Sequence, residues 1–310
     1  MHHSARLQND TKLLPESPHN SKEENHHQAG VSKREREWTV GKAGKRNSSA
    51  VFTYVSYYYR RPREKNYMNV SWAGTSGEKN LWIFLCSYKT FLSKYPMLLL
   101  VDTETPKEDV ELIQSFGVNT KGVRILPHLD PRPAGNNVAN EHMTKLLIWS
   151  LVEYERIVFL DLDAWPVTDI SWMFELPLRH GQAAVSNPLR NYPVNTGVML
   201  IAPNLSMYGL LMSTYLRGDY KRKMKGIAGD QALMKDKIVF DFLPQGLNVK
   251  WPHRRPQMKP KEVFVIHNLL EEKAKFINYA KQHGWNRLLT YIKLTEQVRK
   301  GRCVNLSVFV

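Results

Sequence analysis

Short apolar runs separated by amphipathic stretches dominate the first half of the chain. Three of these runs are rich in β-branched, aromatic or aliphatic residues and predict buried strands; they cover residues 51–57, 97–102 and 123–126. Helical patterns lie between them, at residues 81–93 and 105–116. Alternating strands and helices of this kind predict an α/β fold with a Rossmann-like, mostly parallel central sheet flanked by helices, in a single domain.

The second of these helices has a recognisable start. Thr105 is the expected N-cap, Pro106 the first helical residue and Glu108 the N3 acid, and Gly117 follows the last turn. After a loop rich in Pro, Gly and Asn, a further helix is expected around residues 143–149.

A fourth apolar run, residues 157–160, leads directly into Asp161-Leu162-Asp163. Residues i and i+2 of an extended chain point the same way, so the two carboxylates are expected to face one point at the end of the strand. Ligands of open α/β sheets bind at this edge, and two adjacent anions favour a divalent cation between them. The alternative is a pair of acids that cap the following helix.

The second half adds three comparable features. Residues 195–197 (Asn-Thr-Gly) predict a turn that leads into an apolar strand ending near residue 201. Gly229-Asp230-Gln231 predicts a helix start, where an acid is also favoured by the helix dipole. The apolar run 263–266 ends on His267, which matches the strand-end acids in form.

Charge and cysteine content narrow the picture only slightly. The 310 residues carry 44 Lys+Arg against 29 Asp+Glu, a formal charge of +15, which favours anionic partners. Cys86 and Cys303 form neither a disulfide framework nor a zinc site and are interpreted as free thiols of a reducing compartment. With no signal-like or membrane-spanning apolar run, we expect a cytoplasmic protein, or a Golgi one if the N-terminus is incomplete.

The segment from Glu141 to Asp163 resembles the glycogenin-like, family 8 retaining glycosyltransferases. It contains Thr144-Lys145-Leu146, Trp149, Glu153-Tyr154, an apolar strand and the Asp-x-Asp pair. The Asn-Thr-Gly, Gly-Asp-Gln and His267 blocks follow in that family's order. The resemblance implies a GT-A fold and an enzyme that moves a hexose from a UDP-sugar with Mn²⁺.

The resemblance also implies roles for individual residues. The metal ligands would be Asp161, Asp163 and His267. Asp230 and Gln231 would orient the sugar and stabilise charge in the transition state. The donor-binding set implied is Tyr57, Lys145, Asp161, Leu162, Asp163, Asn195, Thr196 and Lys273.

The chain also departs from the family's pattern. Leu270 stands where the family has a glycine that lets backbone approach the phosphates, and Ile227 stands where it often has an acid. No tyrosine lies between Tyr220 and Tyr279, the interval in which glycogenin carries its self-glucosylated tyrosine. We therefore expect a separate glycan, polyol or protein acceptor.

The domain organisation follows. Residues 1–50 are polar and His-rich and are expected to form a disordered basic tail. Residues 51–290 form the expected family 8 catalytic domain, and 291–310 a C-terminal extension without an assigned role. The assembly state stays open, with a homodimer as one alternative.

Two other classes of function compete. A haloacid-dehalogenase-like phosphatase also uses a strand-end Asp-x-Asp, but it needs Thr or Val where this chain has Trp165. A non-catalytic protein that binds nucleic acid or acidic membrane would use the basic runs at 221–225 and 253–255, although no nucleic-acid module accompanies them.

Overall fold

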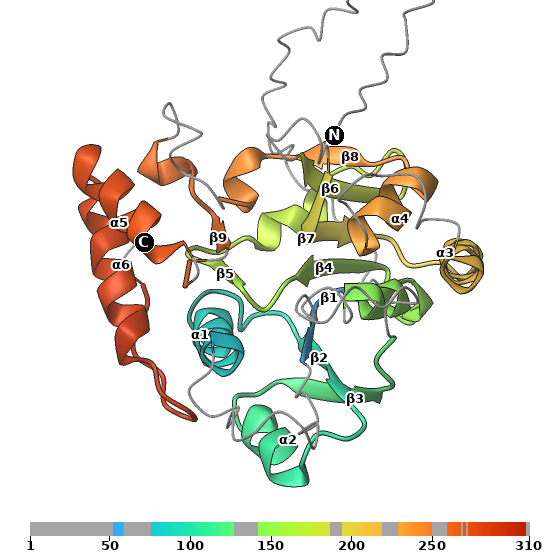
Figure 1. The fold of residues 1–310 in the computed structure, drawn as a ribbon, viewed down its shortest axis with the longest axis horizontal. Helices are drawn as coiled ribbons and strands as arrows, with labels where there is room; N and C mark the ends of the chain where they lie inside the picture. The colour runs from blue at the N-terminus through green and yellow to red at the C-terminus, as the bar shows by residue number, and fades with distance from the viewer. Residues whose placement is uncertain are drawn as a thin grey trace, which may run out of the picture. The chain divides into compact units, whose positions relative to one another are not determined.

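A seven-stranded sheet forms the centre of the molecule (Figure 1). The computed structural model describes residues 52–58, 76–126, 142–186, 194–218, 229–249, 259–267, 269–270 and 272–307. The expected tail, both basic runs and Ile227 lie outside these residues. The strand order is β3-β2-β1-β4-β7-β6-β8. These strands are β1 (Phe52–Tyr58), β2 (Met97–Asp102), β3 (Asn119–Val123), β4 (Arg156–Leu160), β6 (Gln182–Ser186), β7 (Val194–Ile201) and β8 (Asp241–Leu243).

Most neighbouring strands of this sheet run parallel, as the sequence predicts. The exception is β7, which pairs antiparallel with both β4 and β6. A separate two-stranded ribbon pairs β5 (Ala164–Pro166) with β9 (Val265–His267). The mostly parallel α/β architecture predicted from the apolar runs is thus confirmed.

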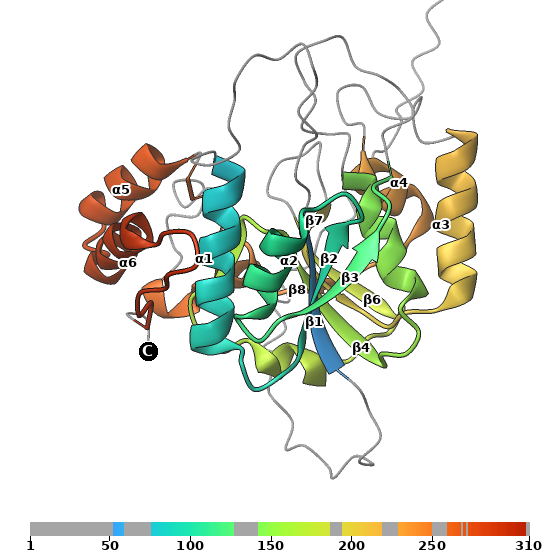
Figure 2. The same ribbon diagram turned by 90° about the horizontal axis from the view of Figure 1, so that it is seen from below.

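Helices cover both faces of the sheet (Figures 1 and 2). One hydrophobic cluster packs α1, α5 and α6 against the ribbon and one face, and a second packs the 3₁₀ helix η2 and α3 against the other. The helices are α1 (Ser76–Phe91), α2 (Lys107–Gln114), α3 (Leu205–Arg217), α4 (Asp230–Lys237), α5 (Lys273–Gln282) and α6 (Asn286–Gln297). The 3₁₀ helices are η2 (His142–Ser150), η3 (Ser171–Glu175), η4 (Gln245–Leu247) and η6 (Pro260–Glu262).

Two local predictions are wrong. Helix α2 begins at Lys107 with Pro106 as its N-cap residue, and the Thr105 hydroxyl is buried without a hydrogen-bond partner among the described residues. The third strand is β3, a few residues earlier than predicted. Because β3 is an edge strand with mostly exposed side chains, it lacks the apolar run that marks buried strands.

The two cysteines form a disulfide, which corrects the expectation of free thiols. Cys86 lies in the middle of α1 and Cys303 follows α6, with Cα atoms 5.3 Å apart and 217 residues of sequence between them. The bond ties the C-terminal segment to the core. Among the described residues, no helix combines the length and apolar character needed to cross a bilayer.

Candidate active site

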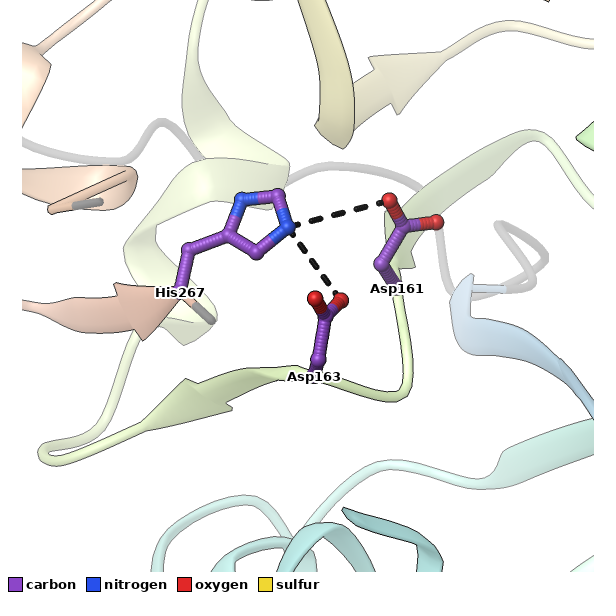
Figure 3. A group of neighbouring side chains, drawn as sticks. All are labelled: Asp161, Asp163 and His267. Carbon is purple, nitrogen blue, oxygen red and sulfur yellow. Dashed lines mark ion pairs between the residues drawn. The ribbon is translucent and has the colours of Figure 1, made fainter. Parts of the chain in front are cut away.

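Asp161, Asp163 and His267 converge where β4 ends (Figure 3). The two acids lie in the turn from β4 to β5, which is closed by the Ala164 N–H donating to the Asp161 carbonyl at 2.8 Å. The ribbon pairs Ala164 with His267 and so brings the imidazole to the same turn. His267 Nε2 lies 3.2 Å from Asp163 Oδ1 and 4.0 Å from Asp161 Oδ2, and one candidate ligand atom from each residue lies within 4.8 Å of the others.

Asn248 fixes the orientation of the imidazole. The Asn248 Nδ2 donates to Asn195 Oδ1 at 2.6 Å. With its NH₂ end directed at Asn195, the oxygen end of the Asn248 amide faces the imidazole, and this Oδ1 lies 2.9 Å from His267 Nδ1. Because an amide oxygen only accepts, Nδ1 is the donor in this contact, and Nε2 is the ring nitrogen that faces the carboxylates. This is how metal-binding histidines are usually held. Asn248 was not predicted from the sequence.

Gly197 provides the space in which these side chains meet. A Cβ at this position would lie 2.3 Å from His267 Cε1 and 2.9 Å from Asp161 Oδ2. The Gly197 carbonyl also accepts from the Asp161 N–H at 2.8 Å, so β7 passes directly beside the acids. The prediction of a turn at residues 195–197 is wrong: all three lie within β7, which continues as a buried antiparallel neighbour of β4.

Lys145, on η2, joins this cluster to a second buried acid. Its Nζ lies 2.9 Å from Asp161 Oδ1 and 3.1 Å from Asp230 Oδ2, and the Lys145 and Asp230 side chains are each only 2% exposed. Burial by itself would lower the pKa of Lys145, but the two carboxylates outweigh it and raise that pKa. Lys145 is therefore a fixed cation inside the site.

Asp230 is held ionised by its surroundings. Burial favours its neutral form, but Lys145, the neighbouring His142 and the hydroxyl of Thr196 together lower its pKa well below the usual range. Thr196 Oγ1 donates to Asp230 Oδ2 at 2.5 Å. Asp230 begins α4, and the preceding Gly229 has φ +132°, which favours glycine.

His142 is a second residue that sequence reasoning missed. Its Nδ1 lies 3.6 Å from Asp230 Oδ1, and its side chain is 40% exposed. Burial lowers the pKa of His142, but the neighbouring Asp230 carboxylate outweighs it and raises that pKa above its ordinary value. It follows Glu141 at the start of the family-like block, but no motif position marked it.

Gln231 has an amide oxygen without a partner. Its Oε1 is buried and has no hydrogen bond within the described part of the chain. Buried acceptors in folded proteins usually have a hydrogen-bond partner, so the Gln231 oxygen next to Asp230 is suited to accept a hydrogen bond from a ligand hydroxyl. The predicted residues Asn195, Thr196, Asp230 and Gln231 thus lie around one buried network.

The remaining predicted donor contacts fall differently. Leu162 is partly buried, and its carbonyl accepts from Trp165 Nε1 at 2.8 Å. Tyr57 belongs to β1, but its side chain lies outside the described residues. The structure does not bring Lys273 into the cluster: its ammonium pairs with Glu296 of α6. Leu270 packs against the hydrophobic core.

Parts of the chain are similar in sequence to curated glycosyltransferases. No protein-family model matches the chain. Galactinol synthase 1 of Solanum lycopersicum is 26% identical over 146 residues, 39% of this chain and 45% of that protein. UDP-glucuronate:xylan alpha-glucuronosyltransferase 2 of Arabidopsis thaliana is 20% identical over 249 residues, 77% of this chain and 38% of that protein. The chain spans less than half the length of these curated relatives.

Solved structures agree on the fold. The galactosyltransferase LgtC in complex with donor and acceptor sugar analogues matches with a TM-score of 0.50 at 13% identity, covering 69% of this chain and 86% of that one. The chain has the GT-A fold of glycosyltransferases. By sequence, the chain is similar in part to galactinol synthase 1 and to a xylan alpha-glucuronosyltransferase, in line with the glycogenin-like motifs. The phosphatase and non-catalytic binding alternatives find no support in these relatives.

Proposed function

We propose that the chain transfers a hexose from a UDP-sugar to a separate acceptor, with retention of anomeric configuration and with a divalent metal. The observation that carries this proposal is the convergence of Asp161, Asp163 and His267 beside the buried Lys145–Asp230 pair. The named activities of the curated relatives support the same class of reaction. Residues 51–290 remain the proposed catalytic domain.

The donor set fits Mn²⁺. Two carboxylates and an imidazole whose Nε2 is free of the Asn248 hydrogen bond suit a borderline cation better than a hard one such as Mg²⁺. When bound, such an ion neutralises the leaving diphosphate as a Lewis acid. Asp161, Asp163 and His267 would hold it, and Gly197 keeps the space between them open.

The chain's own residues would bind and orient the sugar. Lys145 lies between Asp161 and Asp230 and offsets their negative charge. Asp230 and Gln231 would stabilise positive charge that develops on the sugar ring, and the Gln231 oxygen is open to a ligand hydroxyl. Asn195 and Thr196 would position these groups from β7.

The acceptor is proposed to be a separate molecule. Residues 221–278 contain no tyrosine that could be glycosylated in the manner of glycogenin. Incubation with labelled donor alone tests this point, and stoichiometric labelling of a tyrosine of the chain would contradict it.

The disulfide bears on where the enzyme works. Disulfides form and persist in oxidising compartments and are rare in the cytosol. We therefore favour the Golgi alternative over the cytoplasmic one, on the strength of the Cys86–Cys303 bond. Thiol labelling of protein purified without reductant checks it, and two free thiols would restore the cytoplasmic expectation.

A hydrolysis screen tests the activity itself. UDP-glucose, UDP-galactose, UDP-N-acetylglucosamine and UDP-glucuronate are each incubated with the protein, with and without Mn²⁺, and UDP release is measured. Asp163→Ala should reduce release by at least about a thousandfold, because several kcal/mol of transition-state stabilisation depend on the metal. Asp169→Ala, at an exposed acid outside the cluster, is the matched control. Wild-type turnover in Asp163→Ala would refute the proposal.

A further inference from the structure

A second candidate binding site lies at the other end of the β5–β9 ribbon. Here the Val167 N–H donates to the Phe264 carbonyl at 2.9 Å, whereas the opposite end carries the Ala164–His267 pair. Phe264 lies three positions before His267, a span of roughly 10 Å in an extended strand. A pocket of about 620 Å³ opens at the Phe264 end, within the size range of small-ligand sites.

The pocket is strongly basic. Lys259, Lys261 and Arg287 line it, and among the described residues none of their charged groups forms an ion pair or a hydrogen bond. Other lysines in the described part of the chain, such as Lys107, Lys121 and Lys300, pair with nearby carboxylates. The pocket cations are therefore available to an anion from solution. The start of α6, which has no side-chain cap, adds partial positive charge at Asn286.

Two aromatic rings make part of the same wall apolar and rigid. Trp285 is 5% exposed and is held edge-on against Tyr279, with ring centroids 5.2 Å apart. Phe264 packs edge-on against Trp172, with centroids 5.4 Å apart. Trp285 is too buried to present its ring face, so the half-buried Phe264 ring is the one that can pack against the C–H face of a pyranose, while Asn286 and Thr168 offer polar groups to its hydroxyls.

We propose that this pocket binds an acidic sugar unit of the acceptor glycan. Three cations without protein partners among the described residues attract a carboxylate, sulfate or phosphate group, and the Phe264 ring favours a sugar over a bare ion. That the acidic sugar belongs to an acceptor rests on the proposed function, whereas its binding in this pocket does not. The ribbon would hold one part of the glycan here and leave a neighbouring part within reach of the sheet edge.

Direct binding tests this without any turnover. Isothermal titration calorimetry compares a hexamer of galacturonic acid with the neutral hexasaccharide cellohexaose and with hexaglutamate, using the full chain. The variant Lys261→Ala/Arg287→Ala should bind hexagalacturonate at least about tenfold more weakly than the wild type, a loss of about 1.4 kcal/mol. The matched control, Lys107→Ala/Lys121→Ala, removes the same charge at α2 and β3 and should bind as the wild type does.

Each contrary outcome has a distinct meaning. Equal loss in both double variants would show that only net charge matters and would overturn the site. Hexaglutamate or cellohexaose binding as tightly as hexagalacturonate would overturn the acidic sugar as its ligand. UDP-sugar hydrolysis by the pocket variant should be unchanged, since neither residue belongs to the metal cluster. A wild type without hydrolysis would refute the proposed function while leaving the binding result readable.

Discussion

Two lysine–carboxylate pairs in this molecule have opposite settings. At the carboxyl end of β4, Lys145 and Asp230 are each 2% exposed and share a network with Asp161. On the C-terminal helices, Lys273 and Glu296 are 38% and 46% exposed and pair with each other at the surface. Burying ions costs several kcal/mol each, which only a multiply connected network recovers, whereas an exposed pair contributes at most about 1 kcal/mol. Burial therefore distinguishes charged groups that form part of a site from charged groups that only lie on the surface.

Replacing each lysine tests this contrast most strongly. Lys145→Met should lower the free energy of unfolding by about 3–5 kcal/mol, because it leaves two carboxylates without their cation. It should also reduce UDP-sugar turnover by at least about a hundredfold. Lys273→Met should cost no more than about 1 kcal/mol and retain turnover. Urea unfolding and UDP release measure both quantities, and equal losses in the two variants would erase the distinction.

Two glycines allow the same comparison between the site and the surface to be made for packing instead of charge. Gly197→Ala should abolish metal-dependent turnover and destabilise by about 1–3 kcal/mol, because the added Cβ would overlap the His267 ring. The control is Gly209→Ala on the exposed side of α3, where a Cβ would meet nothing within 4 Å. Gly209→Ala should be stabilising by about 0.5–1 kcal/mol. Thermal unfolding and Mn²⁺-stimulated UDP release check both, and a functional Gly197→Ala enzyme would show that the cluster is loosely packed.

The disulfide separates the stability of the C-terminal helices from the chemistry of the sheet edge. Cys303→Ser should lower the free energy of unfolding by about 2–5 kcal/mol, since it removes a cross-link that closes a long loop. Turnover at low temperature should persist, because neither cysteine touches the site. Unfolding with and without reductant provides the measurement: reductant should lower the melting temperature of the wild type and leave Cys303→Ser unchanged.

The smallest expected effect concerns pH at His142. Its pKa is raised in the folded state, so its contribution to stability is complete below its ordinary pKa of about 6.5. That contribution is lost as the pH rises through the raised value. The stability advantage of the wild type over His142→Gln should therefore fall as the pH rises above about 6.5, by a few tenths of a kcal/mol, since solvent screens the partly exposed ring. A difference that is constant with pH would contradict the pairing with Asp230.

The buried strands and the meeting of Asp161, Asp163 and His267 could be predicted because their signals are local. Apolar runs mark β2, β4 and β7, and the acids and His267 follow such runs directly. Edge strand β3 has mostly exposed side chains, so its run was placed too late. The Asn-Thr-Gly block resembles a turn because its small and polar residues favour turns, but antiparallel pairing of β7 with β6, in which Asn195 lies opposite Val185, keeps it extended.

What sequence could not provide was the choice of partner. Asn248 orients His267 from an irregular segment after η4, and nothing in its neighbourhood marks it. Lys273 matches a family lysine, yet its ammonium forms an ion pair with Glu296 on the next helix. Cys86 and Cys303 gave no spacing signal, because the fold alone brings them together. Contacts between distant segments decide each of these cases.

The position of Cys303 has a consequence for the order of biogenesis. Every strand of the central sheet precedes it in the chain. Its bond to Cys86 cannot form while the polypeptide is still emerging from the ribosome with the sheet incomplete; it can only seal a domain whose strands have all been synthesised. The cross-link therefore forms late. Oxidation would act on a domain whose sheet strands have all been synthesised, and a chain truncated before α6 could not form the bond.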